Sequence, residues 1–493
     1  MEIRKDWLDR SVDLLWGLVL LCLPVTSFPF IPLLGSGTQV RPLSIYPLAL
    51  LLPLLLVQIL KKRIKSWHPV FTTLGIFLII VIVTACFGVL LAPVELRGQS
   101  YFGRVTRALI TVVIGLGFFL AAIWSVRSKE QIRSSLKWLY LGLIFSFVWG
   151  MIQYAVFKGW ILDKETLYHL QKMVSVAGIS YKNLRIPGFS LEPSWLAGQL
   201  AVIYLPWLFA SLLTGYQLTR WRWLEFVLTG MALVMLLLTY SRSGLLMVLA
   251  TSILTLLLFG GEKFRLVWSW WKKPFSRSIP AHSNRIGHFS IRLAMLVTIF
   301  AFVGLGAKIL TDNPYFSQIW ESRKTNLVDY VIDIYAGPRL AYVWSGLETF
   351  NQHPLTGVGL GAGGFYLYEN LPDWSRTFIP EISKHLSPLN TAYPNTKNLL
   401  VRIISETGFL GFASFIAFLC YLMAESLVFL KKPGVQNRFF SVVGVFTMIT
   451  LIIFCFTQDS FAMPNTWINM GMLLGLASMT TKLNNGSGEK YLS

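Results

Sequence analysis

Apolar runs recur along the whole chain, and short basic clusters separate them. A run of about 20 apolar residues is long enough to cross a bilayer as a helix. In lipid every backbone polar group must be satisfied within the span, which favours helices. The pattern therefore predicts an all-α integral membrane protein with about twelve transmembrane helices. Their expected starts lie near residues 11, 43, 70, 108, 138, 196, 223, 244, 293, 399, 440 and 467.

The basic clusters set the expected orientation. They precede the first predicted span and follow the even-numbered ones, as at 61–65 after the second span. Cytoplasmic loops carry this excess of lysine and arginine, so both termini are expected in the cytoplasm. The predicted parts are transmembrane helices 1–9 (residues 1–310), one large periplasmic or extracellular loop with short helices (311–398), transmembrane helices 10–12 (399–480) and a cytoplasmic tail (481–493).

Composition supports this class of protein. Hydrophobic residues make up 54% of the chain and charged residues 13%, while the net charge is +20. Because the basic residues lie between apolar spans, the charge is assigned to orientation and not to nucleic-acid binding. Free cysteines within apolar runs behave as small buried hydrophobes, and this is expected of Cys22, Cys86, Cys420 and Cys455. No HExxH motif or Cys/His cluster lies on the predicted outer side, so neither a cofactor nor a catalytic metal is expected.

Four arginines lie on the predicted outer side, where arginine is normally scarce: Arg185, Arg242, Arg339 and Arg402. Ionisable side chains near membrane depth are costly and mark candidate functional sites. Guanidinium groups bind phosphate oxygens bidentately, so these arginines can converge on a lipid-linked diphosphate. Three of them also have a structural interpretation. Arg242 can contact lipid phosphates, Arg339 can be simply exposed, and Arg185 can form a salt bridge with Glu192.

A glycine-rich stretch, HPLTGVGLGAGGF (353–365), follows a predicted amphipathic helix. The apolar stripe expected on that helix comprises Leu340, Val343, Leu347 and Phe350. GLGAGG has the spacing of a dinucleotide-binding loop, but no βαβ unit surrounds it. The glycines are instead expected to permit a strained turn near a ligand or the membrane. His353 reads as a helix-end or turn residue, or as a site residue.

Glycosyl transfer from a lipid-linked diphosphate needs charge stabilisation on the leaving group and a base for the acceptor hydroxyl. Arginines can provide the first without a metal. The outward candidates for the base are Glu192, Glu348, Glu369, Asp373, Glu381, Lys397 and His353.

The motifs TYSRSG (239–244), RLAYVWSGLETFNQHPLTGVGLGAGGF (339–365) and NTKNLLVRIISETGFLGF (395–412) follow one another in this order. Together they resemble the O-antigen ligase and O-antigen polymerase superfamily over about residues 180–430. The resemblance implies a metal-independent glycosyltransferase in the bacterial cytoplasmic (inner) membrane. Its donor would be a glycan on undecaprenyl diphosphate and its acceptor a glycan or a lipid, with a chain-length regulator as a further partner to consider.

The resemblance also suggests roles for particular residues. By the resemblance, Arg242 and Arg339 fall on the family's arginines that face the diphosphate, and Arg185 is expected to do likewise. Arg402, His353 and Tyr240 are further candidates for binding the diphosphate or substrate. The catalytic candidates are Lys397, Glu192 and Arg339, of which Glu192 resembles a polar position of the polymerase-like members.

Lys397 departs from the family pattern, because ligases have histidine where this chain reads NTKN. A lysine with an ordinary pKa of about 10.4 is protonated and accepts no proton, although burial or neighbouring cations can lower the pKa of a lysine. The change favours a polymerase that joins repeat units over a ligase that moves the finished glycan to a lipid or protein. A polysaccharide flippase or transporter is the remaining alternative. A transporter would show discontinuous helices and midplane charges, whereas these charges gather at one interface.

Overall fold

The computed structural model describes residues 6–30, 38–62, 68–91, 95–179, 184–272, 285–386, 393–431 and 433–477. Helices make up 74% of the structure. The described residues form no strand beyond two isolated bridges, Ser27 to Arg41 and Leu96 to Gln99. The predicted tail at 481–493 lies outside the described residues.

Seven helical segments of the described residues are long and apolar enough to cross a membrane. They are α3 (Val70–Gly88), α4 (Tyr101–Ser125), α5 (Lys129–Phe157), the joined segment Pro193–Thr214, α10 (Arg242–Phe259), the joined segment Leu399–Lys431 and α19 (Val435–Cys455). The other predicted spans also fall on helices: α1 (Trp7–Leu21), α2 (Ile45–Leu60), α9 (Arg222–Leu238), α12 (Arg285–Thr311) and residues 468–477. The all-helical architecture with multiple membrane-capable helices is confirmed, and the count of twelve and the orientation stay predictions.

The segment Pro193–Thr214 forms the most buried of these candidate spans. It consists of α7 (Pro193–Gln199), a π-helical turn, η2 (Leu200–Tyr204), and α8 (Leu205–Thr214). A π-turn disturbs the regular ladder of backbone hydrogen bonds. Asn469 compensates, because its Nδ2 donates to the carbonyl oxygens of Val202 at 2.7 Å and Ile203 at 3.2 Å. Its Oδ1 accepts from the indole of Trp207 at 3.0 Å.

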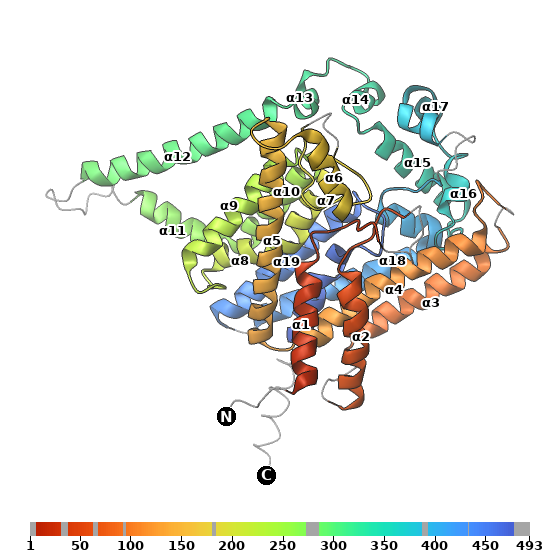
Figure 1. Cartoon of the computed structure of the whole chain (residues 1–493), viewed down its shortest axis with the longest axis horizontal. Helices are drawn as coiled ribbons and strands as arrows, with labels where there is room; N and C mark the ends of the chain where they lie inside the picture. Colours follow the sequence, from red (N-terminus) through yellow and green to blue (C-terminus); the bar gives the residue numbers. More distant parts are fainter. Residues whose placement is uncertain are drawn as a thin grey trace, which may run out of the picture.

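Short helices fill the segment that was predicted to form the large outer loop. They are α13 (Pro314–Glu321), α14 (Leu327–Asp333), α15 (Gly337–Gln352), α16 (Gly363–Leu367), α17 (Asp373–Phe378) and the π-helical turn η4 (Glu381–His385). Figure 1 shows α13 to α17 together at the end of the molecule opposite the start of α1. Two further helices, α6 (Lys164–Val174) and α11 (Gly261–Lys272), lie between the longer ones in sequence.

Helix α15 forms as expected, with Pro338 in its first turn, but the predicted apolar stripe is not its buried face. Leu340 and Leu347 are 39% and 42% exposed. The buried residues are mostly small: Gly337, Ala341, Tyr342, Ser345, Gly346 and Thr349. A Cβ on Gly346 would lie only 2.4 Å from Cγ1 of Val401. Helix α15 therefore packs closely on α18 (Leu399–Val428) through small side chains, which an apolar stripe does not reveal.

Candidate functional site

Two of the predicted arginines meet at the ring of Tyr315 in α13. The guanidinium carbons of Arg185 and Arg242 lie 4.7 Å and 4.3 Å from the ring centroid, within the range of cation–π attraction. Arg242 also donates to the backbone carbonyls of Tyr315 and Ile334. The outer helices α13 and α14 are thereby attached to the turn between α9 and α10.

The motif TYSRSG explains where Arg242 lies. Ser241 caps α10, and its hydroxyl accepts a hydrogen bond of 3.2 Å from the backbone N–H of Gly244, as expected of an N-cap serine. Tyr240 takes a left-handed backbone conformation with φ of 46°. A Cβ on Gly244 would lie 2.4 Å from Cβ of Ala197. The glycine thus allows α10 to approach α7, and Arg242 begins α10 beside that contact.

The charges of four predicted site residues act on one another. Burial lowers the pKa of Arg185, and the positive charges of Arg242 and Arg339 lower it further. Tyr315 and the carboxylate of Glu192 act in the opposite direction and raise the pKa of Arg185. Arg185 and Glu192 lie in the loop before α7, whereas Arg242 begins α10, Tyr315 lies in α13 and Arg339 lies in α15. The tertiary structure therefore brings Arg185 and Arg242 together at Tyr315, with Arg339 and Glu192 near enough to Arg185 to change its pKa.

Within this region, Arg185 donates from Nε to the carbonyl oxygen of Thr239 at 2.9 Å. Glu192 forms the N-cap of α7 and accepts from the Ser194 hydroxyl at 3.1 Å. No ion pair joins Arg185 and Glu192 among the described residues, so the salt bridge considered from the sequence does not form. Arg339 is exposed in the first turn of α15.

A second group of side chains surrounds Lys397. Its ammonium forms an ion pair with Glu381 from η4 and lies 5.1 Å from the ring centroid of Tyr342. The Tyr342 hydroxyl donates to the same carboxylate oxygen of Glu381 at 3.1 Å. Burial raises the pKa of Tyr342, and the negative charge of Glu381 raises it further. Tyr342 is therefore protonated and acts as a donor.

The backbone at Lys397 is unusual. It has φ of 49°, a left-handed conformation that is uncommon for a non-glycine residue and persists where the surrounding structure enforces it. The next residue, Asn398, is the N-cap of α18, and its side chain accepts from the Val401 N–H at 3.1 Å. The NTKN motif thus starts α18 and directs the lysine toward Glu381.

The first turn of α15 connects the two groups. Arg339 and Tyr342 are three residues apart on this helix, and such pairs are neighbours on a helix surface. Arg339 acts on Arg185, while Tyr342 contacts Lys397 and Glu381. One helical turn therefore separates Arg339 from Tyr342, which contacts the lysine and its carboxylate.

Arg402 belongs to a third, buried arrangement. It donates from Nε to Glu406 at 3.0 Å and from a terminal nitrogen to the Asp459 carbonyl at 2.7 Å. Glu406 also accepts from the backbone N–H groups of Gly361 at 2.7 Å and Gly363 at 3.3 Å. The glycine-rich stretch thus wraps around a carboxylate of its own chain. These contacts account for Arg402 structurally, and a substrate contact by Arg402 stays a prediction.

His353 is the C-cap of α15, as a helix-end residue. Its ring lies 5.6 Å from that of Tyr366, centroid to centroid, in an edge-on arrangement. No contact joins it to the predicted arginines or to Lys397 in the part of the chain that the structure describes.

Several residues of these groups were not singled out from the sequence. Arg104 in α4 lies with its guanidinium carbon 3.7 Å from the ring centroid of Tyr393. The sequence could have indicated Arg104, because it lies on the predicted outer side, just before the fourth predicted span. The other candidate arginines were found by the same criterion. Tyr315 and Tyr342 had no such signal, since tyrosine is common at membrane interfaces.

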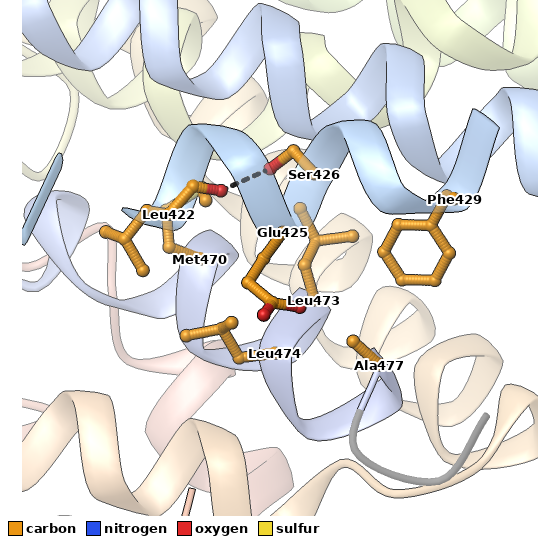
Figure 2. Close-up of a pocket in the computed structure, with 8 residues that line it drawn as sticks. All are labelled: Leu422, Glu425, Ser426, Phe429, Met470, Leu473, Leu474 and Ala477. Carbon is orange, nitrogen blue, oxygen red and sulfur yellow. Dashed lines mark hydrogen bonds between the residues drawn. The ribbon is translucent and has the colours of Figure 1, made fainter. Parts of the chain in front are cut away.

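A hollow at the other end of α18 is separate from these groups. Figure 2 shows Glu425 there among apolar side chains. The lining residues are Leu422, Glu425, Ser426, Phe429, Met470, Leu473, Leu474 and Ala477. The hollow lies near the C-terminal end of α18, beyond the break at Gly408, whereas Arg402 lies in the first turn of this helix. Glu425 accepts from the Tyr421 hydroxyl at 2.8 Å, so its carboxylate is already bonded within the helix.

The fold and these groups define a multi-pass membrane protein with a cationic, tyrosine-lined site at one end of its helices. Residues 226–416 match the family model described as O-Antigen ligase. This segment is similar to that family, and the resemblance to the O-antigen ligase and polymerase superfamily predicted from the motifs is confirmed over these residues. Members of this family are membrane glycosyltransferase-like enzymes that act on lipid-linked glycans. No curated protein matches the chain.

Proposed function

We propose that the protein polymerises repeat units of O-antigen or another surface polysaccharide at the outer face of the bacterial cytoplasmic membrane. Its donor is an oligosaccharide on undecaprenyl diphosphate, and the leaving group is undecaprenyl diphosphate. The observation that carries this proposal is the meeting of Arg185 and Arg242 at the ring of Tyr315, with Arg339 near enough to lower the pKa of Arg185. Arg339 lies one turn of α15 from Tyr342, which contacts Lys397.

The arginines suit the chemistry of this reaction. The leaving diphosphate gains negative charge as the glycosidic bond breaks, and fixed cations lower the energy of that state. Arginine stays charged at any physiological pH and binds phosphate oxygens with two parallel hydrogen bonds. Exposed Arg339 is placed to meet a substrate directly. Arg242 is bonded to two carbonyls of the outer helices, so it links diphosphate binding to their position.

A ligase is the second candidate, favoured by the description of the matching family model. It would use the same donor and transfer the finished glycan to a lipid or protein. Lys397 at the position of the ligase histidine favours the polymerase.

A flippase or transporter is the third candidate. Helix α18 has a break at Gly408, which is a transporter-like feature. The backbone groups around that break are bonded to the neighbouring segment instead: Phe409 N–H donates to Pro354 at 2.8 Å, and Gly359 N–H donates to Glu406 at 2.8 Å. These backbone groups at the break are thus hydrogen-bonded within the chain, which favours an enzyme over a transporter.

The decisive experiment uses purified full-length protein in detergent with an undecaprenyl-diphosphate-linked repeat unit. A ladder of lengthened glycans on a gel supports the polymerase. Transfer that occurs only when a lipopolysaccharide-core acceptor is added supports the ligase. Movement of the lipid-linked glycan across a vesicle membrane without any change in glycan length overturns both. The Arg339→Ala variant serves as the inactive control.

A further inference from the structure

The proposed transfer needs a group that accepts the proton of the acceptor hydroxyl. Lys397 does not suit this role in the observed arrangement. Its ammonium is ion-paired with Glu381. A lysine ammonium has three donors and no acceptor. The position that holds histidine in ligases therefore provides a hydrogen-bond donor here.

Glu381 offers carboxylate oxygens that can accept a proton, which the Lys397 ammonium does not. One of its carboxylate oxygens receives both the Lys397 ammonium and the Tyr342 hydroxyl, the latter at 3.1 Å. No donor to the other oxygen is recorded among the described residues. The side chain is 40% exposed. Oε1 is thus held by two donors, and the side chain that carries both oxygens is partly exposed.

The local backbone supports a specialised role for Glu381. It begins the π-helical turn η4, and π-turns occur frequently at functional sites. Its partner Lys397 has left-handed backbone geometry, which also clusters at such sites. Tyr342 is kept protonated by burial and by the Glu381 charge, since both raise its pKa.

The other carboxylates considered from the sequence are placed differently. Glu192 caps α7 and bonds Ser194. Glu348 bonds the side chain of Asn351 at 3.3 Å. Of the described carboxylates that were candidates for the base, Glu381 is the one in contact with Lys397. Glu381 also accepts a hydrogen bond from Tyr342, which lies one helical turn from Arg339 on α15.

We propose that Glu381 is the general base and that Lys397 and Tyr342 position it. In this step the acceptor O–H bond breaks and its proton passes to a carboxylate oxygen of Glu381. The acceptor oxygen forms a bond to the anomeric carbon of the donor sugar. The bond from that carbon to the diphosphate oxygen breaks, and its electron pair leaves with the diphosphate, which the arginines stabilise. This inference rests on the proposed function and identifies the proton acceptor of its reaction.

The test measures glycan extension by full-length Glu381→Gln and Glu381→Ala, with Glu348→Ala as the matched control. A general base contributes about 10²- to 10⁴-fold, so both Glu381 variants are expected to lose kcat by that factor while KM for the donor changes little. Sodium formate supplies a small carboxylate and is expected to restore part of the activity of Glu381→Ala. Glu348→Ala is expected to keep normal activity.

Glu381→Gln with extension within a few-fold of wild type overturns the inference, as does Glu381→Ala that formate fails to restore. A thermal unfolding midpoint equal to that of wild type shows that a lost activity is not lost folding. Failure of the proposed function gives a different result, because the wild-type protein then extends no lipid-linked glycan at all.

Discussion

The carboxylate of Glu406 accepts a hydrogen bond of 2.7 Å from the backbone N–H of Gly361, 45 residues earlier in the chain. The same carboxylate pairs with Arg402 at 3.0 Å. The two separate motifs GLGAGG and ETG thus meet in one structural contact. This contact holds the glycine-rich stretch against α18.

Loss of the Glu406 carboxylate should destabilise the protein strongly. Glu406→Ala leaves Arg402 buried without its partner, and breaking a buried ion pair costs about 3–5 kcal/mol. We expect a clearly lower thermal unfolding midpoint in detergent. The double variant Arg402→Met with Glu406→Met removes both charges and should recover part of the loss. A midpoint for Glu406→Ala equal to wild type would contradict the structural role.

Gly408→Ala should also destabilise the protein. Gly408 has φ of 63° and ψ of −168°, a region that is essentially restricted to glycine and costs other residues about 1–3 kcal/mol. An added Cβ would also lie 2.2 Å from the Leu355 carbonyl oxygen. Gly75→Ala in α3 is the matched control, because its Cβ meets no atom within 4 Å. Equal unfolding midpoints for the two variants would show that the break in α18 is not required.

Arg339→Ala should abolish most glycan extension without unfolding the protein. Removing one donor to a developing anion costs about 10²- to 10³-fold in rate, and exposed Arg339 holds no buried contact that folding needs. Arg242→Ala should have a similar effect on extension. Arg323→Ala, also exposed in the outer segment, should stay active. Near-normal extension by Arg339→Ala or Arg242→Ala would exclude a diphosphate role for that residue.

The ring of Tyr315, and not its hydroxyl, should matter for the arginine group. The ring faces the guanidinium groups of Arg185 and Arg242, and each cation–π contact is worth about 0.5–1 kcal/mol at an exposed site. Tyr315→Phe should therefore keep normal donor affinity, whereas Tyr315→Ala should weaken it several-fold in KM. The idea fails if the phenylalanine variant is as impaired as the alanine variant.

Lys397 variants separate a chemical role from a structural one. Lys397→His retains a donor toward Glu381 and should keep substantial extension activity. Lys397→Met removes the ion pair and should lower kcat at least about tenfold, equivalent to about 1.4 kcal/mol. Full activity of Lys397→Met would mean that the lysine only anchors the start of α18 at the interface.

The helical architecture could be predicted because span length is a local property of the sequence. Within the described residues, each expected span falls on helical backbone, including Val70–Gly88 and Val435–Cys455. The buried face of α15 could not be predicted in the same way. An apolar stripe indicates the core in a water-soluble helix, but α15 packs through glycine, alanine and serine and leaves Leu340 and Leu347 partly exposed.

The sequence by itself determined the class of protein, its superfamily and most of the charged residues of the site. It could do so because charge is rare in an apolar chain, so Arg185, Arg242, Arg339 and Lys397 stand out. Only the tertiary structure decided which of them act together. The pairing of Lys397 with Glu381, and the separate role of Arg402, depend on contacts between segments far apart in the chain. Such contacts arise from packing of α15, η4 and α18, and no local periodicity records them.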